Sequence, residues 1–251
     1  MEAVQLTGTS IDGSRLDEGS GWWDQATGCW IAVSTPEVAP DLWEQYLKGA
    51  LRSYRRHGLE WVLDLDAIRD GADTALFFAA VDPKGLVVAG TRVVGPLRSP
   101  EESHALAEWS GNKGFDALHK MIADRLAFGV AEVKGAWADT HAYRSRALTT
   151  VLARTALPIM TLLDVQFVMA TAAAHVLEQW RSSGGVVAAR VPAAAYPNEN
   201  YRTKLMWWDR RTLATHAEPE QFKLMFAENS EILRRVSALS ELEWLPMGVG
   251  G

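Results

Sequence analysis

The hydrophobic pattern of the chain changes its period several times, and each change predicts a different kind of element. Residues 1–21 are mostly polar or small, and the apolar run at residues 29–33 predicts a short strand over the core. Apolar positions then recur every three or four residues from 42 to 54. This spacing predicts a helix that Asp41 caps and Gly58 ends.

Residues 76–81 and 86–94 predict a β-hairpin. Both runs are almost continuously apolar, as is typical of central strands, and the intervening sequence DPKG suits a tight turn. Arg92 interrupts the second run. Because burying an unpaired guanidinium costs several kcal/mol, Arg92 must find a carboxylate or reach a cleft. The pattern favours a structural ion pair and leaves a substrate contact open.

A strand, a turn and a helix follow one another in residues 128–157. The strand covers residues 130–137, a short polar turn follows, and apolar residues then return at helical spacing. A helix that begins just after a strand can present backbone N–H groups, here with Arg144 and Arg146, to a phosphate. Glu132 lies on the strand before this turn. An ordinary strand–helix unit of an α/β core explains the same pattern, and both interpretations stay open.

The rest of the hydrophobic pattern predicts further helices and strands, and the whole chain is therefore of the α/β (α+β) class. Helices are predicted within residues 99–127, near 174–180 and at 222–239, and strands at 165–171, 186–191 and 204–208. An early hairpin followed by β-α-β-α-β units predicts a mixed central sheet flanked by helices on both faces. No glycine-rich dinucleotide motif follows a strand, so a Rossmann fold is not supported. We expect an irregular lead-in at residues 1–40, one main domain at 41–215, and a C-terminal helix with a disordered tail at 216–251.

Composition narrows the class of protein. The 251 residues, 48% of them hydrophobic and 22% charged, are typical of a soluble globular protein of one large or two small domains. The net charge of −6 argues against a general nucleic-acid binder. A single cysteine, Cys29, excludes an intrachain disulfide and a cysteine-rich zinc site, and the scattered histidines predict no metal site.

Targeting signals are not apparent. The first residues are polar, which does not suit a signal peptide. The longest apolar segment, 147–163, contains Arg154 and Pro158, so no membrane span is expected. A cytoplasmic protein is the default expectation.

Several short motifs lie in a fixed order within residues 51–208. They are Leu51-Arg52 followed by Leu59-Glu60-Trp61, the acidic pair Asp70 and Asp73 before the hairpin, Gly90-Thr91-Arg92-Val93, Ala131-Glu132-Val133, and Tyr143-Arg144-Ser145-Arg146-Ala147-Leu148. Together with the order of elements, these motifs resemble the GCN5-related N-acetyltransferase fold. Within it, the chain looks most like the branch that holds autoinducer (acyl-homoserine lactone) synthases and long-chain N-acyl amino acid synthases.

The resemblance implies a mostly antiparallel sheet and an N-acyltransferase reaction. The donor would be a pantetheine thioester, either acyl-CoA or an acyl carrier protein, with no permanently bound cofactor and no metal. The acceptor would be the amine of a small molecule such as an amino acid. In this resemblance Glu132 and Arg92 are the catalytic residues. The loop that would bind the donor pyrophosphate comprises Arg144, Ser145, Arg146, Ala147 and Leu148, and the substrate-binding residues include Arg52, Trp61, Asp70 and Asp73.

The chemistry of such a reaction sets requirements on the residues. The attacking amine must be neutral, and Glu132 on a central strand facing a cleft would take its proton directly or through water. A structural pairing of Glu132 with Arg92 or Lys134 is the competing interpretation. Negative charge that develops on the thioester oxygen needs donors, which splayed strand N–H groups at residues 131–135 would supply.

An acyl chain would need an apolar tunnel. Trp137 is a candidate for its wall, because an indole suits a surface that is partly polar. The other candidates are Phe128, Phe167, Met169, Trp207 and Trp208. Aromatic and methionine residues on strands are, however, more often part of a core than of a tunnel.

The chain also departs from the pattern of the family. Ala147 and Thr149 stand where the phosphate loop normally has glycines, Gly135 replaces an arginine, and Trp180 falls where many members place a tyrosine general acid. The segment between Arg92 and Glu132 is long for an autoinducer synthase. The missing loop glycines and the missing tyrosine favour an alternative, a catalytically silent domain of the same fold that binds an acyl ligand or a protein partner. The retained Arg92 and Glu132 favour the enzyme.

A carrier-protein donor would need a basic surface on this net-acidic chain, because acyl carrier proteins are acidic. Arg55, Arg56, Arg144 and Arg146 would form one if the first helix packs beside the phosphate loop. Capping of the first helix explains its two arginines equally well. The acceptor, the acyl chain length and the oligomeric state are open at this stage.

Overall fold

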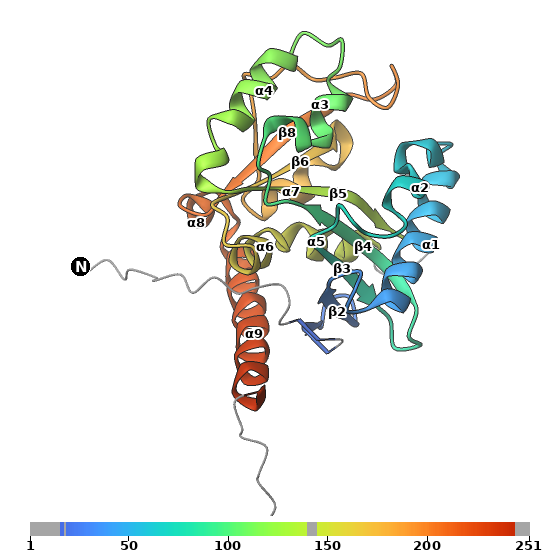
Figure 1. The fold of residues 1–251 in the computed structure, drawn as a ribbon, viewed down its shortest axis with the longest axis vertical. Helices are drawn as coiled ribbons and strands as arrows, with labels where there is room; N and C mark the ends of the chain where they lie inside the picture. The colour runs from blue at the N-terminus through green and yellow to red at the C-terminus, as the bar shows by residue number, and fades with distance from the viewer. Residues whose placement is uncertain (1–15, 18, 140–144, 244–251) are drawn as a thin grey trace, which may run out of the picture.

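One sheet forms the centre of the molecule (Figure 1). The computed structural model describes residues 16–17, 19–139 and 145–243, and within them the sheet has eight strands in the order β1-β2-β3-β4-β5-β6-β8-β7. β5 and β6 pair in parallel, and the other neighbouring strands pair antiparallel. The strands are β1 (Gly21–Asp24), β2 (Cys29–Ser34), β3 (Leu76–Val81), β4 (Val87–Val94), β5 (Val130–Ala138), β6 (Phe167–Ala173), β7 (Val186–Val187) and β8 (Thr203–Asp209). The predicted mixed sheet flanked by helices is confirmed.

Helices cover both faces of this sheet. One face packs against α1 (Pro40–Arg56), α2 (Leu65–Ile68), α3 (His104–Glu108) and α4 (Phe115–Ala123). The other face packs against α5 (Ser145–Arg154), α6 (Ala156–Leu162), α7 (Leu177–Ser182), α8 (Leu213–His216) and α9 (Pro219–Glu243). Short 3-10 turns lie at Glu60–Leu63, Pro100–Glu102, Leu126–Phe128 and Ala174–Val176.

Alternation along the strands separates the two faces. Phe77 belongs to the core beneath α1, whereas its neighbour Phe78 belongs to the core beneath α5, because successive side chains of a strand point to opposite sides. The core beneath α5, α6, α7 and α9 is one continuous apolar cluster. The opposite face instead carries two apolar clusters, one under α1 and one under α3 and α4. The apolar core on that face is therefore interrupted between α1 and α3.

Several elements differ in detail from their predicted form. β1 and β2 join the central sheet, and β2 confirms the short strand predicted at residues 29–33. α1 begins at Pro40, which places Asp41 inside the first turn, where its charge suits the helix dipole, rather than at the cap. β7 has two residues instead of the six predicted, and α9 starts at Pro219, before the predicted residue 222.

None of the helices in the described ranges combines the length and the apolar character needed to cross a bilayer.

Candidate functional site

The parallel strands β5 and β6 part within the sheet. Their pairing runs from Val130 opposite Phe167 to Val133 opposite Ala170 and then stops, although β5 continues to Ala138 and β6 to Ala173. Beyond Val133 the facing edges of the two strands no longer exchange ladder hydrogen bonds. The sheet therefore has a split between β5 and β6 that begins at Lys134.

A β-bulge accompanies this split. In the pairing of β4 with β5, Arg92 lies opposite Lys134 and Gly90 lies opposite Trp137. The two pairs are two residues apart in β4 but three residues apart in β5, so β5 contains one extra residue. Gly135 lies in this bulge with φ +58°, a left-handed conformation that glycine adopts without strain. A Cβ on Gly135 would lie 2.6 Å from Tyr46 Oη, which donates a hydrogen bond to the Gly135 carbonyl at 2.8 Å. Both the backbone conformation and the packing thus require glycine at this position.

Ionisable side chains gather beside the bulge and form what we call the charged cluster. It comprises Asp73, Arg92, His104, Glu108, Glu132 and Lys134. Arg92 lies opposite Lys134 and Val94 opposite Glu132 in the antiparallel ladder, which puts the three charges on one face of the sheet. The charged cluster is what separates the two apolar clusters of that face.

Arg92 forms the ion pair that its position in a central strand requires. Its Nη1 donates to both carboxylate oxygens of Asp73, each at 2.9 Å, and to Thr74 Oγ1 at 3.2 Å. His104 Nε2 lies 3.4 Å from Asp73 Oδ2. Burial alone would raise the pKa of Asp73, but the hydrogen bond from His104 and the charge of Arg92 together lower it to about 2. Asp73 is therefore a stable carboxylate that holds Arg92 and His104.

Glu132 does not face a cleft, contrary to the expectation from sequence. Its side chain is fully buried, Oε2 accepts a hydrogen bond from the His104 amide at 2.9 Å, and Oε1 accepts one from the Ala105 amide at 3.1 Å. The long segment between β4 and β5 folds as α3 and α4 and places the first amides of α3 on this carboxylate. Burial raises the pKa of Glu132, and the nearby positive charge of Lys134 opposes this shift. Neither of the anticipated partners is its main contact, since Arg92 pairs with Asp73 and Lys134 Nζ is 4.0 Å away.

Lys134 instead pairs closely with Glu108 of α3. Burial alone would lower the pKa of Lys134, but the charges of Glu108 and Glu132 raise it. Glu108 Oε1 accepts the hydrogen bond from Lys134, and Glu108 Oε2 is buried without a hydrogen-bond partner among the described residues. Tyr54 of α1 and Tyr196 interact electrostatically with Glu108 and Lys134, and burial raises the pKa of both phenols.

The other predicted substrate-binding residues are spread more widely. Asp73 belongs to the charged cluster, and Trp137 is buried against Tyr46, with ring centroids 6.3 Å apart. Arg52, Trp61 and Asp70 are exposed, and within the described ranges no hydrogen bond or ion pair joins them to the charged cluster.

The predicted tunnel residues do not share one wall. Trp137 lies under α1, while Phe167, Met169 and Trp207 lie under α3 and α4. Trp208 is on the opposite face of the sheet, and Phe128 is half-exposed. Trp180, at the predicted tyrosine position, is buried and packs edge-on against Trp208.

The predicted phosphate loop is only partly described. Arg144 lies outside the described residues, and Ser145 is the first residue of α5. Arg146 is exposed, Ala147 is half-buried, and Leu148 is buried in the core. Arg56 at the end of α1 forms an ion pair of 2.9 Å with Asp139, just after β5. The basic end of α1 therefore lies beside the chain that leads into α5.

Sequence reasoning missed His104 and Glu108, which the fold brings to the split. The available signal was a carboxylate within the otherwise apolar stretch ALAEW at residues 105–109. A charge in such a stretch must be paired when the helix is buried, but its partner lies on β5 and only the tertiary fold identifies it.

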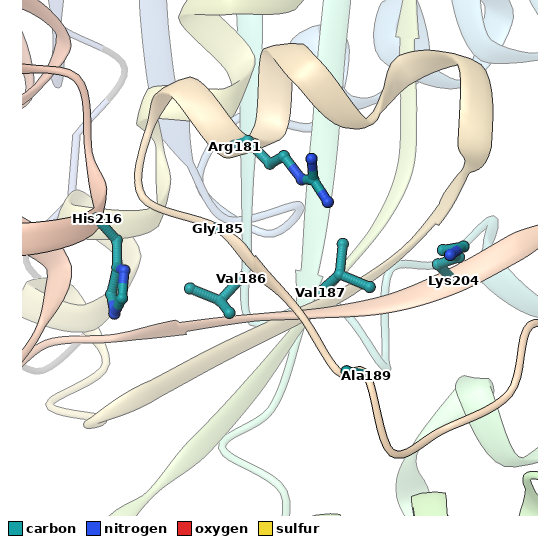
Figure 2. Close-up of a pocket in the computed structure, with 7 residues that line it drawn as sticks. All are labelled: Arg181, Gly185, Val186, Val187, Ala189, Lys204 and His216. Atoms are coloured by element: carbon teal, nitrogen blue, oxygen red, sulfur yellow. The ribbon is translucent and has the colours of Figure 1, made fainter.

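Two surface hollows share no residue with the charged cluster. The larger, of about 560 Å³, lies beside the β7 edge of the sheet, where Arg181, Lys204 and His216 surround Val186 and Val187 (Figure 2). The other, of about 370 Å³, lies near the start of β6 and is lined by Phe128, Asp164, Val165, Gln166, Arg210 and Arg211. Within the described ranges, no group of three or more histidine, cysteine or acidic side chains is arranged to hold a metal ion.

Solved structures with a similar fold include three synthases. FeeM, an N-acyl amino acid synthase from uncultured soil microbes, aligns with a TM-score of 0.52 at 12% identity and covers 77% of this chain and 97% of its own. BjaI, a CoA-dependent acyl-homoserine lactone synthase, aligns with a TM-score of 0.53 at 13% identity over 84% of this chain and 100% of its own. LasI, another acyl-homoserine lactone synthase, gives a TM-score of 0.51 at 11% identity over 76% and 98%. The chain thus shares the fold of these synthases, and the acyl-CoA N-acyltransferase fold implied by the resemblance is confirmed.

Sequence comparison gives the family. No protein-family model matches the chain. Uncharacterized protein Rv1356c of Mycobacterium tuberculosis (strain ATCC 25618 / H37Rv) and uncharacterized protein Mb1391c of Mycobacterium bovis (strain ATCC BAA-935 / AF2122/97) are each 56% identical over 241 residues. Each alignment covers 96% of this chain and 91% of the relative. The chain belongs to the same family as these mycobacterial proteins.

Proposed function

We propose that this protein is an N-acyltransferase that transfers an acyl group from a pantetheine thioester to the amine of a small acceptor such as an amino acid. One observation carries the proposal: β5 and β6 separate after Val133, and a bulge at Gly135 and a cluster of ionisable side chains lie at that point. The split offers backbone donors to an extended thiol arm, and the charged cluster offers groups for proton transfer. The fold shared with acyltransferases agrees with this function.

The chemistry divides between backbone and side chains. The neutral amine attacks the thioester carbonyl carbon, the carbon–nitrogen bond forms, and the carbon–sulfur bond breaks. Negative charge on the carbonyl oxygen would be stabilised by backbone N–H groups near Lys134 and Gly135, where the ladder to β6 has ended. The thiolate leaves and takes up a proton.

Donor binding is assigned to the start of α5. The amides of its first turn and the exposed side chain of Arg146 suit a pyrophosphate. The ion pair between Arg56 and Asp139 brings the basic end of α1 toward the same region. A carrier protein would approach through this surface, whereas CoA would place its phosphates on it.

Asp73 and Arg92 are assigned to the acceptor side as a fixed pair. Nη1 of Arg92 donates to both oxygens of Asp73 at 2.9 Å, which would hold Arg92 in place, and an acceptor would reach the pair beside the partly exposed side chains of His104 and Asp73. Glu132, buried behind the amides of α3, would position α3 and add negative charge to the site rather than touch the acceptor.

Release of free thiol from acyl donors tests the proposal. Purified protein is incubated with acyl-CoA or acyl carrier protein of several chain lengths and with a panel of amino acids and other amines. Thiol release that requires an amine, together with mass-spectrometric detection of an N-acyl product, is the expected result. Lipids extracted from an expressing strain would show the same new N-acyl species. Background thiol release with every donor and acceptor would refute the proposal.

A second candidate is a silent domain of the same fold that binds an acyl ligand or a protein partner. The closure of Glu132 by α3 and the buried Trp180 at the predicted tyrosine position favour this alternative. It predicts thermal stabilisation by acyl-CoA without any turnover, and detection of an N-acyl product excludes it.

A further inference from the structure

The segment between β4 and β5 does more than cover the sheet. It contains α3 and α4, which lie together at one end of the sheet (Figure 1). α3 meets β5 at two points about one helical turn apart. Its first amides bind Glu132, and Glu108 at its last residue pairs with Lys134. One short helix therefore determines the surroundings of both carboxylates beside the split.

The carboxylates of Glu132 and Glu108 differ in how many of their oxygens accept hydrogen bonds from described residues. Both oxygens of Glu132 accept backbone hydrogen bonds, and the side chain has no exposed surface. Glu108 uses Oε1 for Lys134, while Oε2 has no hydrogen-bond partner in the part of the chain that the structure describes. A buried carboxylate oxygen without a partner is costly, and a polar ligand that donates a hydrogen bond to it would remove that cost.

The surroundings of Glu108 suit an ammonium group. Lys134 of β5 pairs with it, and Glu132 of β5, Tyr54 of α1 and Tyr196 of the segment before β8 interact with it electrostatically. Tyr54, Tyr196 and Lys134 are only partly buried, so this side of the charged cluster reaches solvent. Lys134 is also the first residue of β5 beyond the part that pairs with β6. The Glu108–Lys134 pair therefore lies at the start of the split.

We propose that Glu108, rather than Glu132, binds the acceptor ammonium and takes its proton. This inference rests on the proposed acyltransferase function. Oε2 of Glu108 accepts a hydrogen bond from the ammonium and then one proton, which leaves the neutral amine to attack the thioester. A second amine proton is lost as the amide forms, and the departing thiolate gains one. The balance is one ammonium and one thioester giving one amide, one thiol and one proton.

The test compares glutamine variants with two kinds of acceptor. An amino acid is protonated at neutral pH and needs a base, whereas methoxyamine is largely neutral there and does not. Glu108→Gln is expected to lower kcat/KM for the amino acid by about 10²- to 10⁴-fold, the usual contribution of a general base. It should lower kcat/KM for methoxyamine less than about threefold. A purely structural role would reduce both rates alike.

Two further variants serve as controls for Glu108→Gln, one for the burial of the carboxylate and one for its position in the segment between β4 and β5. Glu132→Gln alters the buried carboxylate on the adjacent strand, and Asp116→Asn alters an exposed one on α4. We expect Glu132→Gln to affect both acceptors equally and Asp116→Asn to affect neither. Should Glu108→Gln not fold, Glu108→Gln combined with Lys134→Met removes both charges of the pair, a change that buried ion pairs often tolerate. The same selective loss is expected of this double variant.

The outcomes separate this inference from the proposed function. If the wild-type protein releases no thiol with any amine, the acyltransferase function itself is wrong. If the wild-type protein is active but Glu108→Gln, or the double variant in its place, keeps its rate with the amino acid, Glu108 is not the base. Selective loss in Glu132→Gln, rescued by methoxyamine, would return the role to the strand glutamate.

Discussion

Two buried ionic clusters in this molecule differ in a way that separates structure from function. In the first, Arg154 of α5 binds Asp24 of β1 at 2.6 Å and Glu228 of α9 at 2.7 Å, and all three side chains are at most 7% exposed. In the second, the charged cluster, exposure grades from the fully buried Glu132 to His104, whose side chain is 39% exposed. Burial of charge alone therefore does not mark a site. The charged cluster stands out because it reaches solvent, adjoins the split in the sheet and contains a carboxylate oxygen, Oε2 of Glu108, that has no hydrogen-bond partner among the described residues.

The difference follows from what surrounds each cluster. Arg154 lies in the continuous core beneath α5, where its two carboxylate partners join α5 to a strand and to the C-terminal helix. The charged cluster lies on the face that carries two separate apolar clusters, and its members Asp73 and His104 are 33% and 39% exposed. We expect substitutions in the first cluster to change stability, and those in the second to change activity as well.

The largest effect is expected from Arg154→Met. It leaves Asp24 and Glu228 buried without their cation, which should cost about 3–5 kcal/mol of unfolding free energy. Urea denaturation measures this loss, and Arg210→Met, which removes an exposed ion pair of 3.6 Å, should cost less than about 1 kcal/mol. Similar losses in the two variants would show that the first cluster does not support the fold.

Glu132→Ala should come next. The backbone amides of His104 and Ala105 lose their acceptor, at about 1–3 kcal/mol each, and the loss of a buried charge offsets part of this. We expect a net loss of about 2–4 kcal/mol in urea denaturation. Glu102→Ala, which removes a partly exposed ion pair with Arg98 near the start of the same segment, should cost less than about 1 kcal/mol. A neutral Glu132→Ala would mean that α3 does not depend on this carboxylate.

Gly135→Ala tests the bulge. Alanine at φ +58° is strained by about 1–2 kcal/mol, and its Cβ would also meet Tyr46 Oη at 2.6 Å. Gly85→Ala is the matched control, because Gly85 has φ +80° and open space around it. Both variants should lose stability, but only Gly135→Ala should also slow thiol release. Equal activity of the two would separate the bulge from the reaction.

Asp73→Asn should have a smaller effect that depends on pH. The pKa of Asp73 is lowered from 3.8 to about 2 in the folded protein, so the folded state favours the carboxylate. Its contribution to stability is complete above pH 3.8 and is lost as the pH falls toward 2. The stability difference between wild type and variant should be constant at neutral pH and shrink over that window, as measured by urea denaturation at several pH values. A pH-independent difference for Asp73→Asn would contradict the pairing with Arg92 and His104.

The smallest change in stability, within about 0.5 kcal/mol, is expected from Arg146→Ala, because Arg146 is exposed. If it contacts the donor phosphates as proposed, CoA should bind about tenfold more weakly, the equivalent of one charge-assisted hydrogen bond. Isothermal titration with CoA measures this affinity, with Arg211→Ala, near the start of β6, as an exposed control. Unchanged affinity would remove Arg146 from the donor site.

Local patterns were enough to predict most of the architecture. Apolar periodicity and turn residues depend on near neighbours, so the hairpin of β3 and β4, the strand–helix unit of β5 and α5 and the mixed sheet could be derived in order. The same reasoning predicted that Arg92 must be paired, because a central strand cannot hold a free guanidinium.

The composition of the site was decided by the tertiary structure. Asp73 became the partner of Arg92 through the register of the sheet, and α3 folded back to bind Glu132 and to bring Glu108 to Lys134. Which charges meet depends on contacts between residues 19 to 28 positions apart in the chain. The sequence by itself specified that strands and charges would be present, through interactions that reach only a few residues. The packing of the segment between β4 and β5 determines that both oxygens of Glu132 accept backbone hydrogen bonds, whereas one oxygen of Glu108 has no partner among the described residues. The local spacing of residues carries no information about that packing.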